Sequence, residues 1–157
     1  MIDKIQIADL IEHPTKAILV ERWIENEWGK LPINDYYLSI YNNINWPYPL
    51  PRTLIALYNQ EIVGTVSVLL DDLETRPEFN PWIGCLFVLK KYRRKGIGSK
   101  LFNEAEKLAI NELGIKKAYL FTENQAHLYS HLGWIEKETD YYKGNKITIM
   151  EKELMNI

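Results

Sequence analysis

The fold of this chain is most clearly indicated by residues 82–99, which read WIGCLFVLKKYRRKGIGS. Residues 82–89 form a nearly unbroken apolar run of strand length, which predicts a central strand buried on both faces of a sheet. Five of the six residues from 90 to 95 are basic, and Gly96 and Gly98 follow them at the start of a helical pattern. The stretch therefore predicts a buried strand, a basic turn and a helix N-terminus in succession.

This succession has the chemistry of an anion-binding site. Glycines let the backbone approach a bulky anion, the helix N-terminus adds roughly half a positive charge, and arginines supply bidentate donors. A pyrophosphate suits this arrangement best. A dinucleotide motif would need a third glycine where the chain has Leu101, and a Walker loop needs a longer glycine-to-lysine spacing. A solvated basic turn, or one that binds RNA, stays open as an alternative.

The segments around this stretch predict one mixed α/β domain spanning residues 1–157. Apolar periodicity and turn residues give the following expected order: a strand at 2–7, helices at 14–28 and 35–44, a proline-rich loop at 46–51, a hairpin of strands 53–58 and 62–70, a polar excursion at 71–81, the strand at 82–89, a helix at 98–113, a strand at 118–122, a helix at 125–132, and a hairpin of strands 134–142 and 147–154.

Composition excludes several classes of protein. The formal net charge of -2 argues against wholesale nucleic-acid binding. The single cysteine, Cys85, allows no internal disulfide and no cysteine-rich zinc site, which suits a reducing cytoplasm. No apolar run approaches the ~20 residues that span a bilayer, and the N-terminus is no signal peptide. We expect a cytoplasmic protein with no metal and no membrane partner.

Residues 86–98 carry a family resemblance. Arg93, Gly96 and Gly98 stand where motif A of the GNAT acetyltransferase superfamily has Arg or Gln, two residues, Gly, one residue, and Gly or Ala. The resemblance implies a mainly antiparallel sheet of about seven strands with four helices, and a V-shaped split between strands 82–89 and 118–122. It also implies acetyl-CoA as co-substrate, with its pyrophosphate on the backbone N–H groups of residues 94–99 and its pantetheine arm along residues 86–88. The implied cofactor contacts are Leu86, Phe87, Val88, Arg93, Arg94, Lys95, Gly96, Ile97, Gly98, Ser99, Asn124 and Tyr129.

A second resemblance lies downstream. Residues 128–134 read LYSHLGW, which is similar to the family's Tyr-x-x-x-Gly-Phe with Trp in the last place. In the family this tyrosine protonates the departing CoA thiolate, so the resemblance assigns that role to Tyr129. A phenol with a pKa near ~10 is a competent donor to a thiolate of similar basicity. A tyrosine that only packs on the helix is the alternative.

The chain departs from the family at the general base. Many members place a Glu on the central strand where this chain has Gly84. An amine must lose a proton before it attacks, so another residue has to accept that proton. The replacements, in order of preference, are Glu74, Asp72 and His127, each of which could instead be a solvated, capping or packing side chain. Cys85 is expected to pack as a small hydrophobe.

The resulting functional prediction is transfer of an acetyl group from acetyl-CoA to an amine of a small molecule or peptide, by direct attack on the thioester. The acidic residues 71–74 favour a cationic acceptor, although a peptide N-terminus fits equally. Aromatic residues concentrate in the first third and mostly predict packing, with one or two lining an amine pocket: Trp23, Trp28, Tyr36, Tyr37, Tyr41, Trp46 and Tyr48. Many relatives are homodimers. The alternative function is a non-catalytic acyl-CoA sensor that has lost its base.

Overall fold

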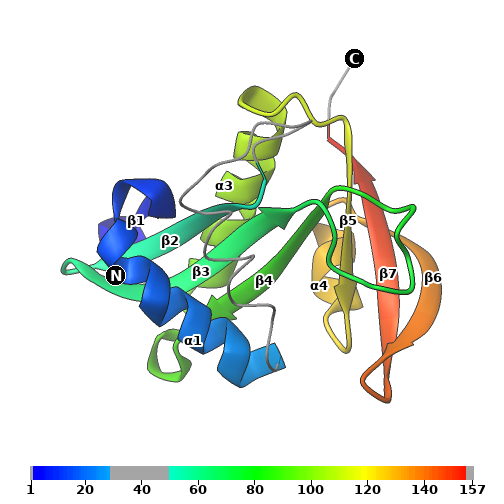
Figure 1. The fold of residues 1–157 in the computed structure, drawn as a ribbon, viewed down its shortest axis with the longest axis horizontal. Coiled ribbons are helices and arrows are strands. Elements are labelled where there is room, and N and C mark those ends of the chain that lie inside the picture. Colours follow the sequence, from blue (N-terminus) through cyan, green and yellow to red (C-terminus); the bar gives the residue numbers. More distant parts are fainter. Residues whose placement is uncertain (1, 29–49, 155–157) are drawn as a thin grey trace.

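The computed structural model describes residues 2–28 and 50–154, which contain a seven-stranded sheet in the order β1-β2-β3-β4-β5-β7-β6 (Figure 1). The strands are β1 Gln6–Asp9, β2 Arg52–Tyr58, β3 Glu61–Leu69, β4 Trp82–Val88, β5 Lys117–Thr122, β6 Ile135–Tyr142 and β7 Asn145–Glu153. All neighbouring pairs are antiparallel except β4 and β5. The mixed, mainly antiparallel sheet predicted from the sequence is confirmed.

Three α-helices lie within the described residues: α1 Ala17–Trp28, α3 Ile97–Asn111 and α4 Ala126–His131. Short 3-10 helices precede β1, α1 and α3 at η1 Ile2–Lys4, η2 Leu10–Glu12, η3 Pro14–Lys16 and η4 Lys90–Tyr92. The strand expected at residues 2–7 thus begins with a helical turn and becomes extended only at Gln6. The helix predicted at 35–44, and the aromatic residues Tyr36, Tyr37, Tyr41, Trp46 and Tyr48, lie outside the described residues.

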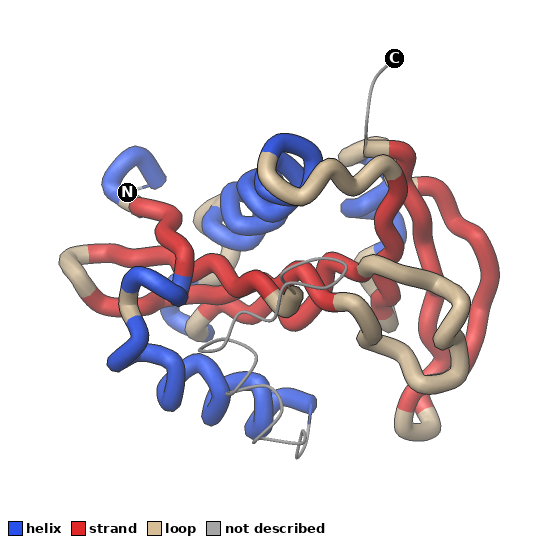
Figure 2. Tube along the Cα trace, turned by 45° about the horizontal axis from the view of Figure 1, so that its top comes forward, coloured by secondary structure: helices blue, strands red, loops and turns tan. Residues whose placement is uncertain are grey.

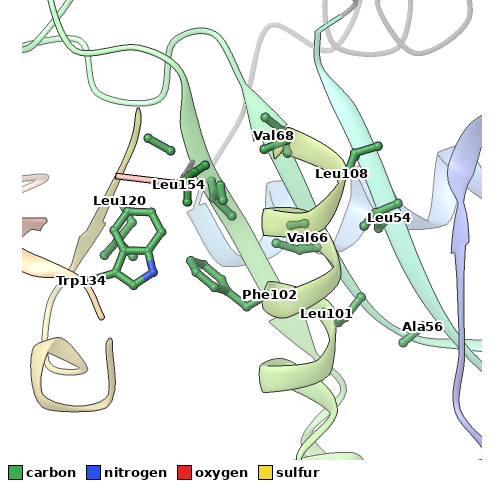
Figure 3. Close-up of a cluster of buried hydrophobic side chains, with 14 of the residues drawn as sticks. Leu54, Ala56, Val66, Val68, Leu101, Phe102, Leu108, Leu120, Trp134 and Leu154 are labelled. Carbon is green, nitrogen blue, oxygen red and sulfur yellow. The ribbon is translucent and has the colours of Figure 1, made fainter. Parts of the chain in front are cut away.

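The helices cover both faces of the sheet (Figure 2). Apolar residues of α3 recur at helical spacing and pack on one face, where Leu101, Phe102 and Leu108 face Leu54 and Val66 (Figure 3). On the opposite face α1 contributes its buried side chains to a second cluster, which includes Ala17, Val20 and Ile24. The sheet is therefore the middle layer of three.

The β2–β3 hairpin forms as its sequence predicts. Asn59 and Gln60 connect the two strands with φ angles of 51° and 67°, the left-handed pair that a two-residue hairpin turn requires. The resulting register sets Thr53 opposite Ser67, and their hydroxyls are 2.8 Å apart. This hairpin brings β3 alongside β4 and so sets the position of the central strand.

β4 lies fourth of seven strands, but only its first half is buried. Trp82 and Ile83 are buried, whereas residues 84–88 are half-buried. β4 and β5 pair only at Trp82 and Tyr119 and then separate (Figure 1). The expectation that residues 82–89 are buried on both faces is therefore wrong for their second half, because that half has no neighbouring strand on one side. The V-shaped split expected at this point is confirmed.

A bulge in β4 accompanies the split. The register against β3 shifts between Thr65 and Ser67, and Cys85 has a φ of 53°. Because a bulge sets two residues of one strand opposite one of its partner, the strand bends and its side chains are re-aimed. The bend turns the second half of β4 away from β5.

Candidate active site

The gap between β4 and β5 holds a cavity of about 340 Å³. Its walls include Ile24 and Ile147 from the α1 face of the sheet and Phe102 and Leu120 from the α3 face. The cavity therefore passes through the sheet from one face to the other. Its remaining lining residues are Trp28, Asp72, Ile83, Gly84, Cys85, Leu86, Phe121, Thr122, Glu123, Gln125, Tyr129 and Tyr142.

The Asp72 carboxyl group enters this cavity from the loop between β3 and β4. Among the described residues no side chain or backbone group donates a hydrogen bond to it, and no cation pairs with it. A Cβ on Gly84 would collide with Oδ2 of Asp72 and would lie 3.2 Å from its Cγ. Burial raises the pKa of Asp72 from 3.8 to about 7. Near neutral pH this carboxyl group can therefore both accept and release a proton.

Tyr129 of α4 lines the same cavity. Its ring packs on Phe102 with the ring centroids 5.0 Å apart, and burial raises the pKa of its phenol above the usual 10.0. The phenol is therefore neutral across the physiological range and is available as a proton donor. Asp72 and Tyr129 approach the cavity from different sides, one from the β3–β4 loop and one from the helix that follows β5.

The N-terminus of α3 presents a row of free backbone donors. Arg94 and Gly96 have φ angles of 61° and 85°, and the first helical bond that follows runs from Lys100 N to Gly96 O at 3.0 Å. The N–H groups of residues 94–99 have no acceptor within the described parts of the chain, and most of these residues are exposed. A helix N-terminus with unpaired N–H groups attracts anions.

Basic side chains surround these N–H groups. Arg93 points back along the chain: its Nε donates to Val88 O at 2.7 Å, and its guanidinium lies 5.5 Å from the centre of the Phe87 ring. Arg94 and Lys95 are exposed. None of these three forms an ion pair with a carboxylate in residues 2–28 or 50–154. The turn therefore offers uncompensated positive charge beside the helix N-terminus, which fits a polyanionic group such as a pyrophosphate.

The other predicted base candidates lie elsewhere. Glu74 is exposed and does not line the cavity. His127 is exposed on α4, with its Nε2 3.0 Å from that of His131, and it also lies outside the cavity lining. Of the three candidates, the fold brings only Asp72 into the cavity.

Of the predicted contacts along β4 and after β5, Phe87 and Val88 line neither cavity of the site, and the others are distributed over two cavities. Leu86 lines the cavity in the split, and Asn124 lines an adjoining cavity of about 550 Å³. The second cavity shares Trp28, Glu123 and Tyr142 with the first, so the two lie side by side. It is completed by Glu27, Lys143 and Asn145. We call this second cavity the outer cavity.

Sequence reasoning did not single out Phe121, Glu123 or Tyr142. They lie at or just beyond the ends of strands, where a local pattern shows only alternation between buried and exposed positions. Phe121 and Tyr142 meet edge to face with ring centroids 5.2 Å apart. Their place in the wall follows from β5 and β6 both flanking β7 in the sheet, an arrangement that no single stretch encodes.

Cys85 lines the cavity beside Asp72. Burial, reinforced by the charge of Asp72, raises the pKa of its thiol well above the usual value. A thiol held in this protonated form is a poor nucleophile.

Neither a metal-binding cluster nor a membrane-spanning helix occurs within the described residues. No three His, Cys, Asp or Glu side chains gather there in a way that could hold a metal ion. No helix in residues 2–28 or 50–154 combines the length and apolar character needed to cross a membrane.

Comparison with known proteins agrees with this geometry. The profile described as "Acetyltransferase (GNAT) family" matches residues 17–134, while no curated protein matches the chain significantly. A GNAT-family acetyltransferase from Streptococcus pneumoniae shares the fold with a TM-score of 0.72 and 21% identity, over 95% of this chain and 98% of that one. The putative acetyltransferase yncA from Salmonella typhimurium, solved with acetyl-CoA, superposes with a TM-score of 0.74 and 14% identity, over 98% and 96%. Ard1 from Thermoplasma volcanium superposes with a TM-score of 0.70 and 15% sequence identity, over 98% of this chain and 99% of that one.

Proposed function

The chain belongs to the GNAT acetyltransferase family, and from that premise we propose that it transfers an acetyl group from acetyl-CoA to a cationic amine. The observation that carries the proposal is the cavity through the split, which Asp72 and Tyr129 enter from different sides. A proton acceptor and a proton donor are the two groups that amide formation from an ammonium ion and a thioester requires.

The residues present suit acetyl-CoA. The N–H groups of residues 94–99 would bind its pyrophosphate, with Arg94 and Lys95 adding charge. The edge of β4 beyond Ile83 has no strand partner on the β5 side, so the backbone groups of residues 86–88 on that edge could pair with the pantetheine amides, although the Val88 carbonyl already accepts from Arg93 Nε. When bound, acetyl-CoA supplies a thioester whose carbonyl carbon is attacked by an uncharged amine, with release of the CoA thiolate.

Asp72 and Tyr129 would move the protons. The Asp72 carboxylate accepts the proton that converts the acceptor's ammonium group to a nucleophilic amine. With a pKa of about 7, Asp72 is ionised in a large fraction of molecules near neutral pH and is more basic than an ordinary carboxylate. The Tyr129 phenol donates its proton to the departing sulfur and recovers one from the solvent, into which the attacking nitrogen releases its second proton.

The charges of the cavity favour an amine that bears no carboxylate. Asp72 and Glu123 are the acidic side chains that line the cavity in the split, and no Lys or Arg of the described residues joins them. Trp28, Phe121 and Tyr142 supply ring faces, which attract alkylammonium ions. A free amino acid would bring its own carboxylate against Asp72 without a compensating cation, which is unfavourable.

The experiment is thiol release from acetyl-CoA with a matched set of acceptors: alkyl monoamines, diamines, aromatic ethylamines and the corresponding amino acids. We expect turnover with the amines and little with the amino acids. Asp72→Asn should lower kcat by about 10²- to 10⁴-fold without changing the affinity for acetyl-CoA, measured by calorimetry. Asp71→Asn, which alters the exposed neighbouring residue, is the control.

Either part of this experiment can contradict the proposal. Tight acetyl-CoA binding without thiol release from any amine would indicate a non-catalytic acyl-CoA sensor. No binding of acetyl-CoA or CoA would remove the proposed function altogether. The cytoplasmic location and the homodimer expected from the sequence stay predictions.

A further inference from the structure

The position of Asp72 is set by the backbone of its loop. Its carboxylate has no hydrogen-bond or ion-pair partner among the described residues, so no contact of its own holds it against Gly84. The loop that carries it contains two successive turns, closed by Arg76 N to Leu73 O at 3.0 Å and Phe79 N to Arg76 O at 3.2 Å. Whatever anchors this loop therefore determines where the carboxylate lies.

Arg76 anchors the loop to strand β6. Its Nε lies 2.5 Å from Oε1 of Glu138, and its Nη1 lies 2.9 Å from Oδ2 of Asp140. The same Asp140 oxygen accepts a hydrogen bond from Thr75 Oγ1 at 2.7 Å. Bonds from Thr75 and from the Tyr141 backbone N–H lower the pKa of Asp140, so this anchor is charged throughout the working pH range. We call these contacts the β6 anchor.

The end of the loop next to β4 is held separately. The Phe79 ring stacks on Tyr119 with centroids 4.8 Å apart, and Trp82 Nε1 donates to Phe79 O at 2.6 Å. These contacts fix the residues after the second turn. Asp72 lies before the first turn, between Leu69, where β3 still pairs with β4, and the β6 anchor, and it is followed by the buried side chain of Leu73.

We propose that Arg76, together with Thr75, positions Asp72 against Gly84 for proton transfer. This inference rests on the proposed function of Asp72. Arg76 does not line the cavity, so it acts through the loop rather than on the substrate. Its planar guanidinium reaches two carboxylates at once, which restrains the backbone in more than one direction.

The groups that face Asp72 do not replace this restraint. Cys85 approaches from β4 and Tyr142 from β6, while Glu123 and Tyr129 line the cavity farther along and Glu74 belongs to the same loop. None of these groups is a cation. If the β6 anchor is lost, nothing in the described surroundings attracts the carboxylate back, and water can reach it. The pKa of Asp72 should then fall toward that of an exposed carboxyl group.

The test is Arg76→Gln, which keeps a polar side chain but removes the charge and the guanidinium group. We expect kcat to fall about 10- to 100-fold. The inflection point on the acidic side of the pH–rate profile should move down by roughly one pH unit or more. The KM for acetyl-CoA should stay within about twofold of wild type, because the cradle at residues 94–99 is untouched. Arg76→Lys, which can keep one ion pair, should recover part of kcat and of the inflection.

Arg52→Gln is the matched control. Arg52 pairs with Asp9 at 2.5 Å, and its side chain is 19% exposed against 24% for Arg76. It joins β1 and β2, away from the cavity. Both variants should lose stability, but only Arg76→Gln should move the inflection.

Two results would overturn the inference. The first is an active wild type together with an Arg76→Gln variant whose kcat and pH–rate inflection are unchanged. The second is an Arg52→Gln variant whose kcat and inflection change as much as those of Arg76→Gln. If Arg76→Gln fails to fold, Thr75→Val removes only the hydroxyl bond and must shift the inflection in the same direction by a smaller amount. A wild-type protein that acetylates no amine would overturn the proposed function as well.

Discussion

The Asp72 carboxylate lies against the Cα of Gly84, in space that a side chain at residue 84 would otherwise occupy. Residue 84 has no side chain, and a carboxylate from the preceding loop occupies the space beside it. The glycine and the aspartate therefore work as a pair, since either a larger residue 84 or a shorter residue 72 would disturb the arrangement.

This pairing predicts a rescue. Gly84→Ala should lower kcat about 10- to 100-fold because its Cβ displaces the carboxylate. Asp72→Ala should lower kcat further, by roughly 10²- to 10⁴-fold. The double variant Gly84→Glu with Asp72→Ala supplies a carboxylate from the strand and should recover activity relative to Asp72→Ala alone. Steady-state kinetics measure all three, and a double variant no better than Asp72→Ala would contradict the pairing.

The raised pKa of Asp72 also predicts how stability depends on pH. In the unfolded chain the group ionises near 3.8, but in the folded protein near 7. Between these values only the unfolded state gains from ionisation, so the free energy of unfolding falls as pH rises through this window and levels off above it. The full effect is about 4 kcal/mol.

Urea unfolding at several pH values between 4 and 8 measures this effect. Asp72→Asn should gain stability relative to wild type as pH rises, whereas Asp71→Asn should follow wild type because residue 71 is exposed. A difference between wild type and Asp72→Asn that is constant with pH would mean that Asp72 is ionised in the folded protein.

Tyr129→Phe should separate proton donation from packing. The ring contact with Phe102 survives the change, so the melting temperature should hardly move. Loss of the donor should lower kcat by about 10- to 10³-fold with little change in the KM for acetyl-CoA. Equal losses in kcat and in thermal stability would instead assign Tyr129 a packing role.

Gly96 should matter for cofactor binding beyond its effect on stability. Its φ is 85° and its nearest neighbour, Ile2, is 3.7 Å from the position of a Cβ, so alanine there is strained but not crowded. Gly114, just after the other end of α3, has a φ of 63° and no atom within 4 Å of the position of a Cβ, so alanine there is also strained but not crowded. Each alanine variant should cost about 1 kcal/mol.

Calorimetric titration of acetyl-CoA distinguishes the two glycine variants. Only Gly96→Ala should weaken binding, because it turns the N–H groups at the start of α3. Equal affinities in both variants would place the pyrophosphate elsewhere.

Glu106 should contribute more to stability than its neighbour Glu104. Oε1 of Glu106 accepts from Trp134 Nε1 and from Lys152 Nζ, both at 3.0 Å, and thereby ties α3 to the segment after α4 and to β7. The Glu106 side chain is 13% exposed, whereas Glu104 forms an exposed pair with Lys107. Glu106→Ala should cost about 2–4 kcal/mol and Glu104→Ala less than about 0.5 kcal/mol in chemical unfolding. Similar costs would show that the buried network contributes little.

Most of the fold could be predicted because its signals are local. The α3 helix shows its period in Leu101, Phe102, Ala105 and Leu108, and the turn at Asn59 and Gln60 separates two apolar strands. Each of these patterns is contained within one stretch and needs no distant partner. The second half of β4 was misjudged because burial on both faces depends on β5, whose divergence the apolar run at residues 82–89 does not reveal.

Within the described residues, the sequence by itself determined the order of strands and helices and the basic, glycine-containing turn at residues 90–98, since hydrophobic period, turn residues and charge act between near neighbours. It also showed that residue 84 has no side chain to act as a base. Only the tertiary structure decided that Asp72, rather than Glu74 or His127, enters the cavity. That choice depends on contacts such as Arg76 with Glu138, between residues 62 positions apart, and on a bulge that turns β4 away from β5. Contacts at that separation come from the folded sheet, and no local pattern encodes them.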